Sequence, residues 1–184
     1  RYAQIGELNK ATATVWIICH GYAQLAEEFI APFEAVADQH TVIIAPEGLS
    51  RFYAKGFGGR VTASWMTRGD RENEIQDYLN YLQQVYDLVR VNAPQAAINL
   101  LGFSQGVATI SRFVAYRKPL FKRLFCCSGA LPEDLDFKAF KIAVADKMVY
   151  YTTGDNDSFF TQQQVQDYKA WVDTLGIDYE FHEF

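Results

Sequence analysis

Ser104, inside Gly102-Phe103-Ser104-Gln105-Gly106, is the residue of this chain best placed to act as a nucleophile. The apolar run 96–101 before it predicts a buried strand, and residues 107–116 after it predict a helix. A G-x-S-x-G sequence between a strand and a helix is typical of a nucleophile elbow, a tight turn that lifts the serine hydroxyl clear of the sheet. Glycines are needed there because a Cβ would press against the neighbouring strand or helix. The alternative is an ordinary turn in which Ser104 only caps the helix.

A second polar signal, Cys19-His20-Gly21-Tyr22, follows the strand expected at 14–19. Ligands of an open parallel sheet bind beyond the carboxyl ends of its strands. There the backbone N–H groups of Tyr22 and Gln105 would hold the oxyanion that develops during acyl transfer. We interpret His20 as a structural histidine that fixes this loop, because the catalytic histidine comes last in the chain order of such sites.

A third polar signal, Gly154-Asp155-Asn156-Asp157, follows the strand expected at 148–152. A carboxylate at this position can accept the Nδ1–H of a histidine, which fixes the tautomer of the imidazole and stabilises the imidazolium. Asp155 and Asp157 both qualify by composition. The alternative is an ordinary turn that carries two solvated acids.

Strand and helix patterns alternate along the rest of the chain, which favours a mostly parallel sheet covered on both faces. The patterns predict strands at 1–5, 14–19, 41–45, 96–101, 124–127, 148–152 and 177–184, and helices at 25–38, 71–92, 107–116, 137–145 and 161–175. Residues 47–68 show no clear period and predict a long excursion. Its apolar residues, together with Phe159 and Phe160, suggest an acyl or aryl pocket; they are Leu49, Phe52, Tyr53, Phe57 and Trp65.

Composition narrows the class of protein. The 184 residues fit one domain. The net charge of -5 gives no indication of the basic surface that binding to nucleic acid or an anionic membrane requires. No apolar run approaches the ~20 residues of a membrane span. The three cysteines, Cys19, Cys126 and Cys127, lie in apolar runs where reduced thiols are the usual state, which predicts a cytoplasmic protein. The oligomeric state stays open.

Several motifs, spread over nearly the whole chain, resemble the phospholipase/carboxylesterase family of α/β-hydrolases, which includes acyl-protein thioesterases and small bacterial carboxylesterases. They are Cys19-His20-Gly21, Ala45-Pro46, Ser64-Trp65, Gly102-Phe103-Ser104-Gln105-Gly106, Cys127-Ser128-Gly129-Ala130-Leu131-Pro132 and Gly154-Asp155-Asn156-Asp157. The resemblance implies an α/β-hydrolase fold, with a mostly parallel central sheet and helices on both faces, in one domain over residues 1–184. It implies a serine hydrolase that cleaves small-molecule carboxylic esters or thioesters through an acyl-enzyme, with a Ser-His-Asp triad and no metal or cofactor. The alternative is an inactive ligand-binding or partner-docking module.

The resemblance also assigns residue roles. It implies that Asp157 rather than Asp155 is the triad acid, and that Trp65 and Met66 line the substrate pocket. Relatives usually carry Trp-Phe-Asp where this chain has Trp65-Met66-Thr67, and the alternative is that these side chains are core residues under a loop.

The resemblance places the triad histidine a few residues beyond the last strand. We therefore expect it after Phe184, in a chain trimmed at both ends, and we interpret His182 as a structural residue within that strand.

Overall fold

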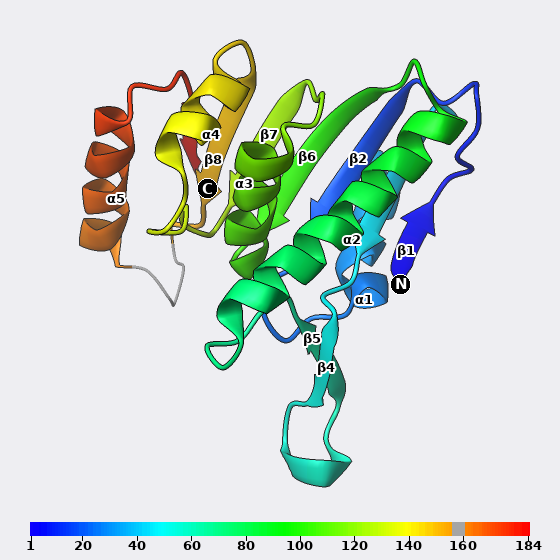
Figure 1. Cartoon of the computed structure of the whole chain (residues 1–184), viewed down its shortest axis with the longest axis horizontal. Helices are drawn as coiled ribbons and strands as arrows, with labels where there is room; N and C mark the ends of the chain where they lie inside the picture. The colour runs from blue at the N-terminus through cyan, green and yellow to red at the C-terminus, as the bar shows by residue number, and fades with distance from the viewer. Residues whose placement is uncertain (156–160) are drawn as a thin grey trace.

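The computed structural model describes residues 1–155 and 161–184. A seven-stranded sheet has the order β1-β3-β2-β6-β7-β8-β9 (Figure 1). The strands are β1 (Tyr2–Ile5), β2 (Thr14–Cys19), β3 (Thr41–Pro46), β6 (Ala97–Phe103), β7 (Arg123–Cys127), β8 (Met148–Thr153) and β9 (Glu180–Glu183). β1 is antiparallel to β3, and the other neighbouring strands pair in parallel. The predicted mostly parallel α/β sheet is therefore confirmed.

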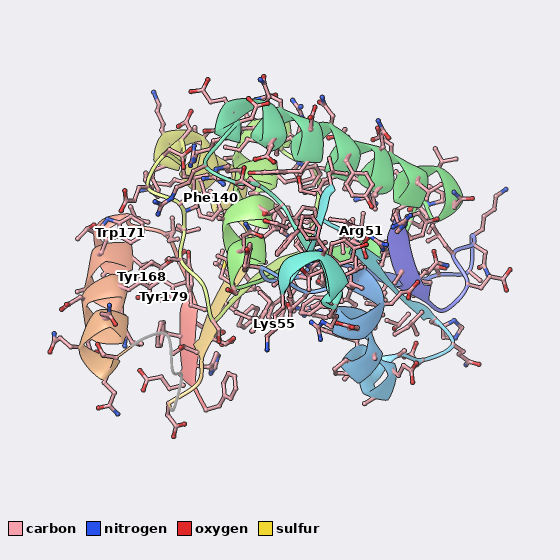
Figure 2. All side chains as sticks on the ribbon, turned by 90° about the horizontal axis from the view of Figure 1, so that it is seen from below. Arg51, Lys55, Phe140, Tyr168, Trp171 and Tyr179 are labelled. Atoms are coloured by element: carbon pink, nitrogen blue, oxygen red, sulfur yellow. The ribbon has the colours of Figure 1, made fainter. Side chains whose placement is uncertain are left out.

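Helices cover both faces of the sheet, as expected. The helices α2 (Arg71–Asn92), α3 (Gln105–Arg117) and α4 (Phe137–Val144) lie on one face, and α1 (Ala26–Ile30) lies on the other (Figures 1 and 2). Helix α5 (Gln162–Thr174) packs beside β8 and β9, and its Val172 belongs to the same apolar core as α2 to α4. Parallel strands buried on both faces need continuous apolar runs, which explains sequences such as Val15-Trp16-Ile17-Ile18 in β2.

The helix predicted at 25–38 is shorter than expected. The α-helix α1 ends at Ile30, and the chain continues as a 3₁₀ helix, η1 (Ala31–Val36), with Pro32 in its first turn. Proline has no N–H to donate to the carbonyl four residues earlier, so an α-helix does not run through it unchanged. The strand predicted at 177–184 is also shorter, because only Glu180–Glu183 pair with β8.

The excursion predicted at 47–68 forms a hairpin that projects from the carboxyl edge of the sheet (Figure 1). Its strands are β4 (Ser50–Tyr53) and β5 (Val61–Ser64), and a 3₁₀ turn, η2 (Gly56–Gly58), lies between them. Each strand has only four residues, too few for a recognisable period. The Glu74 carboxylate on α2 accepts the Thr67 N–H at 2.6 Å and the Ser50 hydroxyl at 3.2 Å, which ties both ends of the hairpin to the body of the protein.

The parallel register brings the polar strand ends to one edge. Cys19 lies opposite Gly102, Phe103 lies opposite Cys127, and Cys127 lies opposite Thr152. The residues that follow β2, β6, β7 and β8 therefore leave the sheet side by side. Over the described part of the chain, no helix has both the length and the apolar character needed to cross a membrane.

Candidate active site

The turn between β6 and α3 has the backbone of a nucleophile elbow. Ser104 has φ 51° and ψ −116°, a conformation that side-chain-bearing residues rarely adopt. A Cβ on Gly102 would lie 2.3 Å from the Gly106 carbonyl oxygen, and a Cβ on Gly106 would lie 2.1 Å from the Cys19 carbonyl oxygen. Both positions therefore require glycine, as the sequence predicted. Within the described chain the Ser104 side chain caps no N–H of α3, which removes the helix-capping alternative.

The loop after β7 supports this turn from behind. The Ser104 N–H donates to the Cys127 carbonyl oxygen at 2.9 Å. A Cβ on Gly129 would lie 2.5 Å from the Ser104 carbonyl oxygen, so the backbone of this loop packs directly on the elbow. The Ser-Gly pair at 128–129 thus has a physical role: it lets the chain pass close behind Ser104.

The loop after β2 lies beside the Ser104 side chain. A Cβ on Gly21 would lie 3.2 Å from Ser104 Cβ, which sets Gly21 and the following Tyr22 against the elbow. Gln105 is the first residue of α3, where N–H groups have no partner within the helix. Among the described residues, neither the Tyr22 N–H nor the Gln105 N–H donates a hydrogen bond. The structure thus brings the two predicted oxyanion donors to the same region as Ser104.

His20 is fully buried behind this loop, and both of its ring nitrogens are engaged by the backbone. Nδ1 lies 2.7 Å from the Gly21 carbonyl oxygen, and Nε2 accepts the Gly48 N–H at 2.9 Å. These partners put the ring proton on Nδ1. Burial lowers the pKa of His20, so the ring is neutral near pH 7. A neutral imidazole with both nitrogens occupied agrees with the structural role expected for it.

Trp65 is 1% exposed and packs in the core under the same loop. Its ring lies 5.0 Å from that of His20, and its Nε1 donates to the His20 carbonyl oxygen at 2.8 Å. Met66 is half-buried, with its sulfur 3.9 Å from an Arg112 nitrogen. Both placements agree with the core alternative, and contact of either residue with a substrate stays a prediction.

The Gln105 side chain has a structural role that the sequence did not reveal. Its Oε1 accepts the Trp65 N–H at 3.2 Å, and its Nε2 donates to the Met66 carbonyl oxygen at 3.1 Å. The residue after the nucleophile therefore clamps the elbow to the end of β5. The only sequence signal for this role is the glutamine within Gly-Phe-Ser-Gln-Gly.

Of the two candidates for the triad acid, only Asp155 is among the described residues. Asp157 lies outside the described residues, so the choice between Asp155 and Asp157 stays a prediction. Asp155 is exposed in the turn after β8, and its N–H donates to the Phe184 carbonyl oxygen at 2.8 Å. His182 lies within β9 opposite Thr152, as expected, with its Nε2 3.2 Å from a Glu180 carboxylate oxygen. Among the described residues no histidine hydrogen-bonds the Ser104 hydroxyl.

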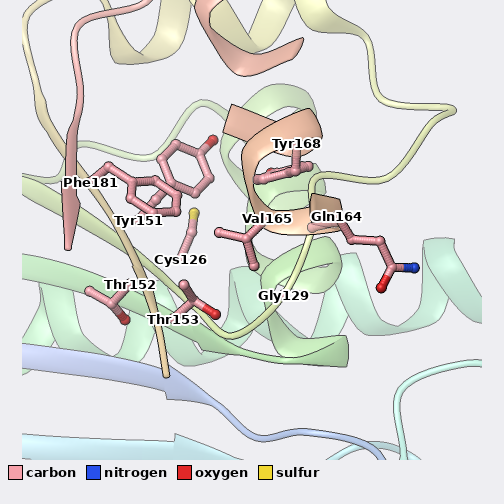
Figure 3. A pocket seen from close by; sticks show the side chains of 10 residues that line it. Cys126, Gly129, Tyr151, Thr152, Thr153, Gln164, Val165, Tyr168 and Phe181 are labelled. Carbon is pink, nitrogen blue, oxygen red and sulfur yellow. The ribbon is translucent and has the colours of Figure 1, made fainter. Parts of the chain in front are cut away.

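A cavity of about 210 Å³ lies between α5 and strands β7 to β9 (Figure 3). Gly129, which contacts the elbow, forms part of its wall. Two hydroxyls that face this region, Tyr151 OH and Thr153 Oγ1, are buried without a hydrogen-bond partner among the described residues. Burial raises the pKa of the neighbouring Tyr168, so its phenol is neutral near pH 7. This region is therefore apolar and uncharged, with two free hydroxyls.

Three of the residues that the sequence suggested for an apolar pocket are exposed, and Phe159 and Phe160, which were expected to add to it, lie outside the described residues. Phe57 is fully exposed at the tip of the hairpin, and Leu49 and Tyr53 are also exposed. The Tyr22 ring stacks on Phe52 at 5.3 Å between centroids, which joins the hairpin to the loop after β2. Figure 2 shows Arg51 and Lys55 on this hairpin, away from the aromatic residues of α5. Over residues 1–155 and 161–184, no group of three or more His, Cys, Asp or Glu side chains is arranged to hold a metal ion.

Comparison with known proteins identifies the family. No curated protein matches the chain in sequence. Acyl-protein thioesterase 2 of Zea mays is 15% identical, with a TM-score of 0.69 over 100% of this chain and 89% of that one. SOBER1 of Arabidopsis thaliana is also 15% identical, with a TM-score of 0.70 over 94% and 89% of the two chains. A Bacillus cereus carboxylesterase is 16% identical, with a TM-score of 0.60 over 100% and 84%. The family model described as phospholipase/carboxylesterase matches residues 1–184, and the chain therefore belongs to this family of α/β-hydrolases.

Proposed function

We propose that this protein is a serine hydrolase that cleaves carboxylic esters or thioesters through an acyl-enzyme. Ser104 Oγ attacks the acyl carbon, and the Tyr22 and Gln105 N–H groups stabilise the oxyanion. A histidine, which we expect after Phe184, takes the serine proton and returns it to the leaving alcohol or thiol, and Asp157 orients this histidine. Water then attacks the acyl-enzyme by the reverse use of the same groups and releases the carboxylic acid.

The conformation of Ser104 is the observation that carries this proposal. A non-glycine residue at positive φ costs about 1–3 kcal/mol and persists only where the surrounding structure holds it. Glycine would remove that cost from an ordinary turn. The strained serine, the glycines on either side of it and the two free N–H groups beside it together support a nucleophile.

Family membership supports esterase or thioesterase activity on small molecules, and the walls of the cavity behind Gly129 support an apolar acyl group. The three cysteines support a cytoplasmic location. Cys19 and Cys126 are separated by β6, which puts them about 9–10 Å apart, too far for a disulfide. Adjacent Cys126 and Cys127 are also unpaired.

Hydrolysis of a series of p-nitrophenyl acyl esters by the full-length protein, with Ser104→Ala as the matched variant, tests the proposal. We expect turnover that the variant loses, with a chain-length optimum set by the acyl pocket.

A second candidate is a hydrolase-fold module that binds a ligand or a partner without turnover. The described residues favour it in one respect, because no histidine among them hydrogen-bonds the Ser104 hydroxyl. A wild-type protein that is inert across the series and unlabelled by a fluorophosphonate would overturn the hydrolase proposal in its favour.

A further inference from the structure

We propose that His20 is a positioning residue for the oxyanion site: its Nδ1–H fixes the Gly21–Tyr22 peptide so that the Tyr22 N–H faces Ser104. This inference rests on the proposed function, because it takes the Tyr22 N–H as an oxyanion donor.

The hydrogen bond from His20 acts on a single peptide plane. The Gly21 carbonyl and the Tyr22 N–H belong to the same peptide unit, and the described chain contains no cis peptide bonds. In a trans peptide the C=O and N–H point in opposite directions. The 2.7 Å bond between His20 Nδ1 and the Gly21 oxygen therefore directs the Tyr22 N–H away from the imidazole. A flip of this peptide would break that bond and turn the carbonyl oxygen toward the place where the N–H is needed.

The Gly21–Tyr22 peptide unit depends on its hydrogen bond to His20 more than the preceding His20–Gly21 unit does. The preceding unit is held at both ends: Trp65 Nε1 donates to the His20 carbonyl oxygen, and the Gly21 N–H donates to Gln24 Oε1 at 2.7 Å. The Gly21–Tyr22 unit has only the imidazole, since within the described chain its N–H donates to no residue. Gly21 has no Cβ, and such a residue rotates with little steric resistance. A side chain at this position would be tightly packed, because a Cβ would lie 3.1 Å from the Phe103 ring and 3.2 Å from Ser104 Cβ.

The surroundings of the His20 imidazole keep its proton on Nδ1. The Gly48 N–H donates to Nε2 at 2.9 Å, so Nε2 must be the unprotonated acceptor. The rings of Trp65, at 5.0 Å, and Phe29, at 6.4 Å, enclose the imidazole. Glu47 is the charged neighbour, and Arg51 binds its carboxylate at 2.7 Å. A residue 28 positions away in the sequence thus selects the tautomer that holds the oxyanion loop.

Two substitutions separate this positioning role from simple burial of a histidine. In His20→Asn, the amide nitrogen replaces Nδ1 and can donate to the Gly21 oxygen, but the side chain is too short to reach Gly48. In His20→Gln, the amide oxygen can accept the Gly48 N–H, but the side chain presents no donor to the Gly21 oxygen. Each variant loses one of the two hydrogen bonds of His20. A purely structural role therefore predicts similar losses of stability and of kcat for both variants.

Steady-state kinetics of the full-length wild-type, His20→Asn, His20→Gln and Ser104→Ala proteins on a p-nitrophenyl ester tests the inference, with urea unfolding midpoints measured in parallel. Loss of one oxyanion donor costs about 10²–10³-fold in kcat, and a peptide that is only loosened should cost part of that. We expect His20→Gln to lower kcat by roughly 10- to 100-fold with KM nearly unchanged, and His20→Asn to retain kcat within about fivefold. The two unfolding midpoints should fall by similar amounts.

The outcomes separate the two proposals. Ser104-dependent turnover with equal kcat in the two His20 variants, or with the greater loss in His20→Asn, would overturn this inference and leave the hydrolase proposal standing. A wild-type protein without Ser104-dependent turnover would overturn both. If the variants do not fold, nitrogen-15 NMR of the histidine rings in the folded wild-type protein decides: a proton on His20 Nδ1 supports the inference, and a proton on Nε2 overturns it.

Discussion

Around the ends of β2 and β6 the backbone is held by buried side chains, whereas around the ends of β8 and β9 buried hydroxyls face a cavity. In the first region, His20 holds the loop after β2, and Gln105 joins the elbow to the end of β5. In the second region, Tyr151 and Thr153 have hydroxyls without partners among the described residues. Both regions lie on the same edge of one sheet.

The contrast between these regions indicates which part of the site is already arranged in the folded protein. Oxyanion stabilisation requires donors that are already oriented before the reaction, and the β2–β6 region provides fixed backbone held by core residues. The β8–β9 region instead encloses apolar volume, which is a feature of a place that receives a group from outside. We therefore expect substitution of the side chains that hold the first region to lower the free energy of unfolding, and removal of the buried Tyr151 hydroxyl in the second region to be tolerated.

Ser104→Ala has the largest expected effect, on activity alone. Removing a catalytic serine costs at least about 10³-fold in kcat, because no other group forms the acyl-enzyme. The variant should fold at least as well as the wild-type protein, since alanine does not alter the packing of Gly102 or Gly106. Ester hydrolysis and urea unfolding of the same samples check both statements, and residual turnover near the wild-type level would place the nucleophile elsewhere.

Gly106→Ala has the largest expected effect on stability. Its Cβ would lie 2.1 Å from the Cys19 carbonyl oxygen, so β2 and α3 must separate, which we expect to lower the free energy of unfolding by about 3 kcal/mol or more. Gly58→Ala in the hairpin is the matched control, because its Cβ would meet no described atom within 4 Å. Urea denaturation compares the two, and equal unfolding midpoints would contradict the close packing of this region.

Gln105→Ala removes the clamp between the elbow and β5. The Trp65 N–H and the Met66 carbonyl oxygen lose their partner, which we expect to cost about 1–3 kcal/mol of stability. Because α3 then loses its hold on the loop, kcat should fall more than KM rises. Kinetics with a short p-nitrophenyl ester measures this split; a change in KM alone would show that Gln105 contacts the substrate rather than the loop.

Much of the fold follows from sequence patterns, while the supports of the site do not. The helix at 71–92 has long apolar periodicity and was predicted with its observed bounds, and the strand-turn-helix around Ser104 follows from local sequence. The hairpin was not predicted, because its strands are too short to show alternation. The bond from Gly48 to His20 joins residues 28 positions apart and involves a backbone N–H, so no side-chain pattern reveals it.

Acid pH should weaken the β2–β6 region in particular. Burial lowers the pKa of His20 below that of the unfolded chain, so below about pH 6.5 the unfolded state binds a proton that the folded state does not. Stability contributed by neutral His20 is therefore present above that pH and is lost as the pH falls. The difference in unfolding free energy between wild type and His20→Asn should be smaller at pH 5 than at pH 7.5, and a difference that grows in acid would mean that His20 is protonated in the fold.

Tyr151→Phe has the smallest expected effect. Its hydroxyl has no partner among the described residues, so its removal should change stability by less than about 0.5 kcal/mol or increase it slightly. The matched control is Tyr86→Phe, because the Tyr86 hydroxyl accepts the Leu120 N–H at 2.9 Å and contacts Arg90 at 3.0 Å. Thermal unfolding should show a clear loss only for Tyr86→Phe. Equal losses would mean that the Tyr151 hydroxyl has a partner in solution.

Covalent labelling tests the claim that Ser104 is an activated nucleophile in a site that folding prepares. The full-length protein is treated with a fluorophosphonate, and the modified peptide is located by mass spectrometry, with Ser104→Ala as the control. We predict one adduct, on Ser104, that is lost when the protein is unfolded in urea before treatment. A folded wild-type protein that carries no adduct, or carries it on another residue, would contradict the claim.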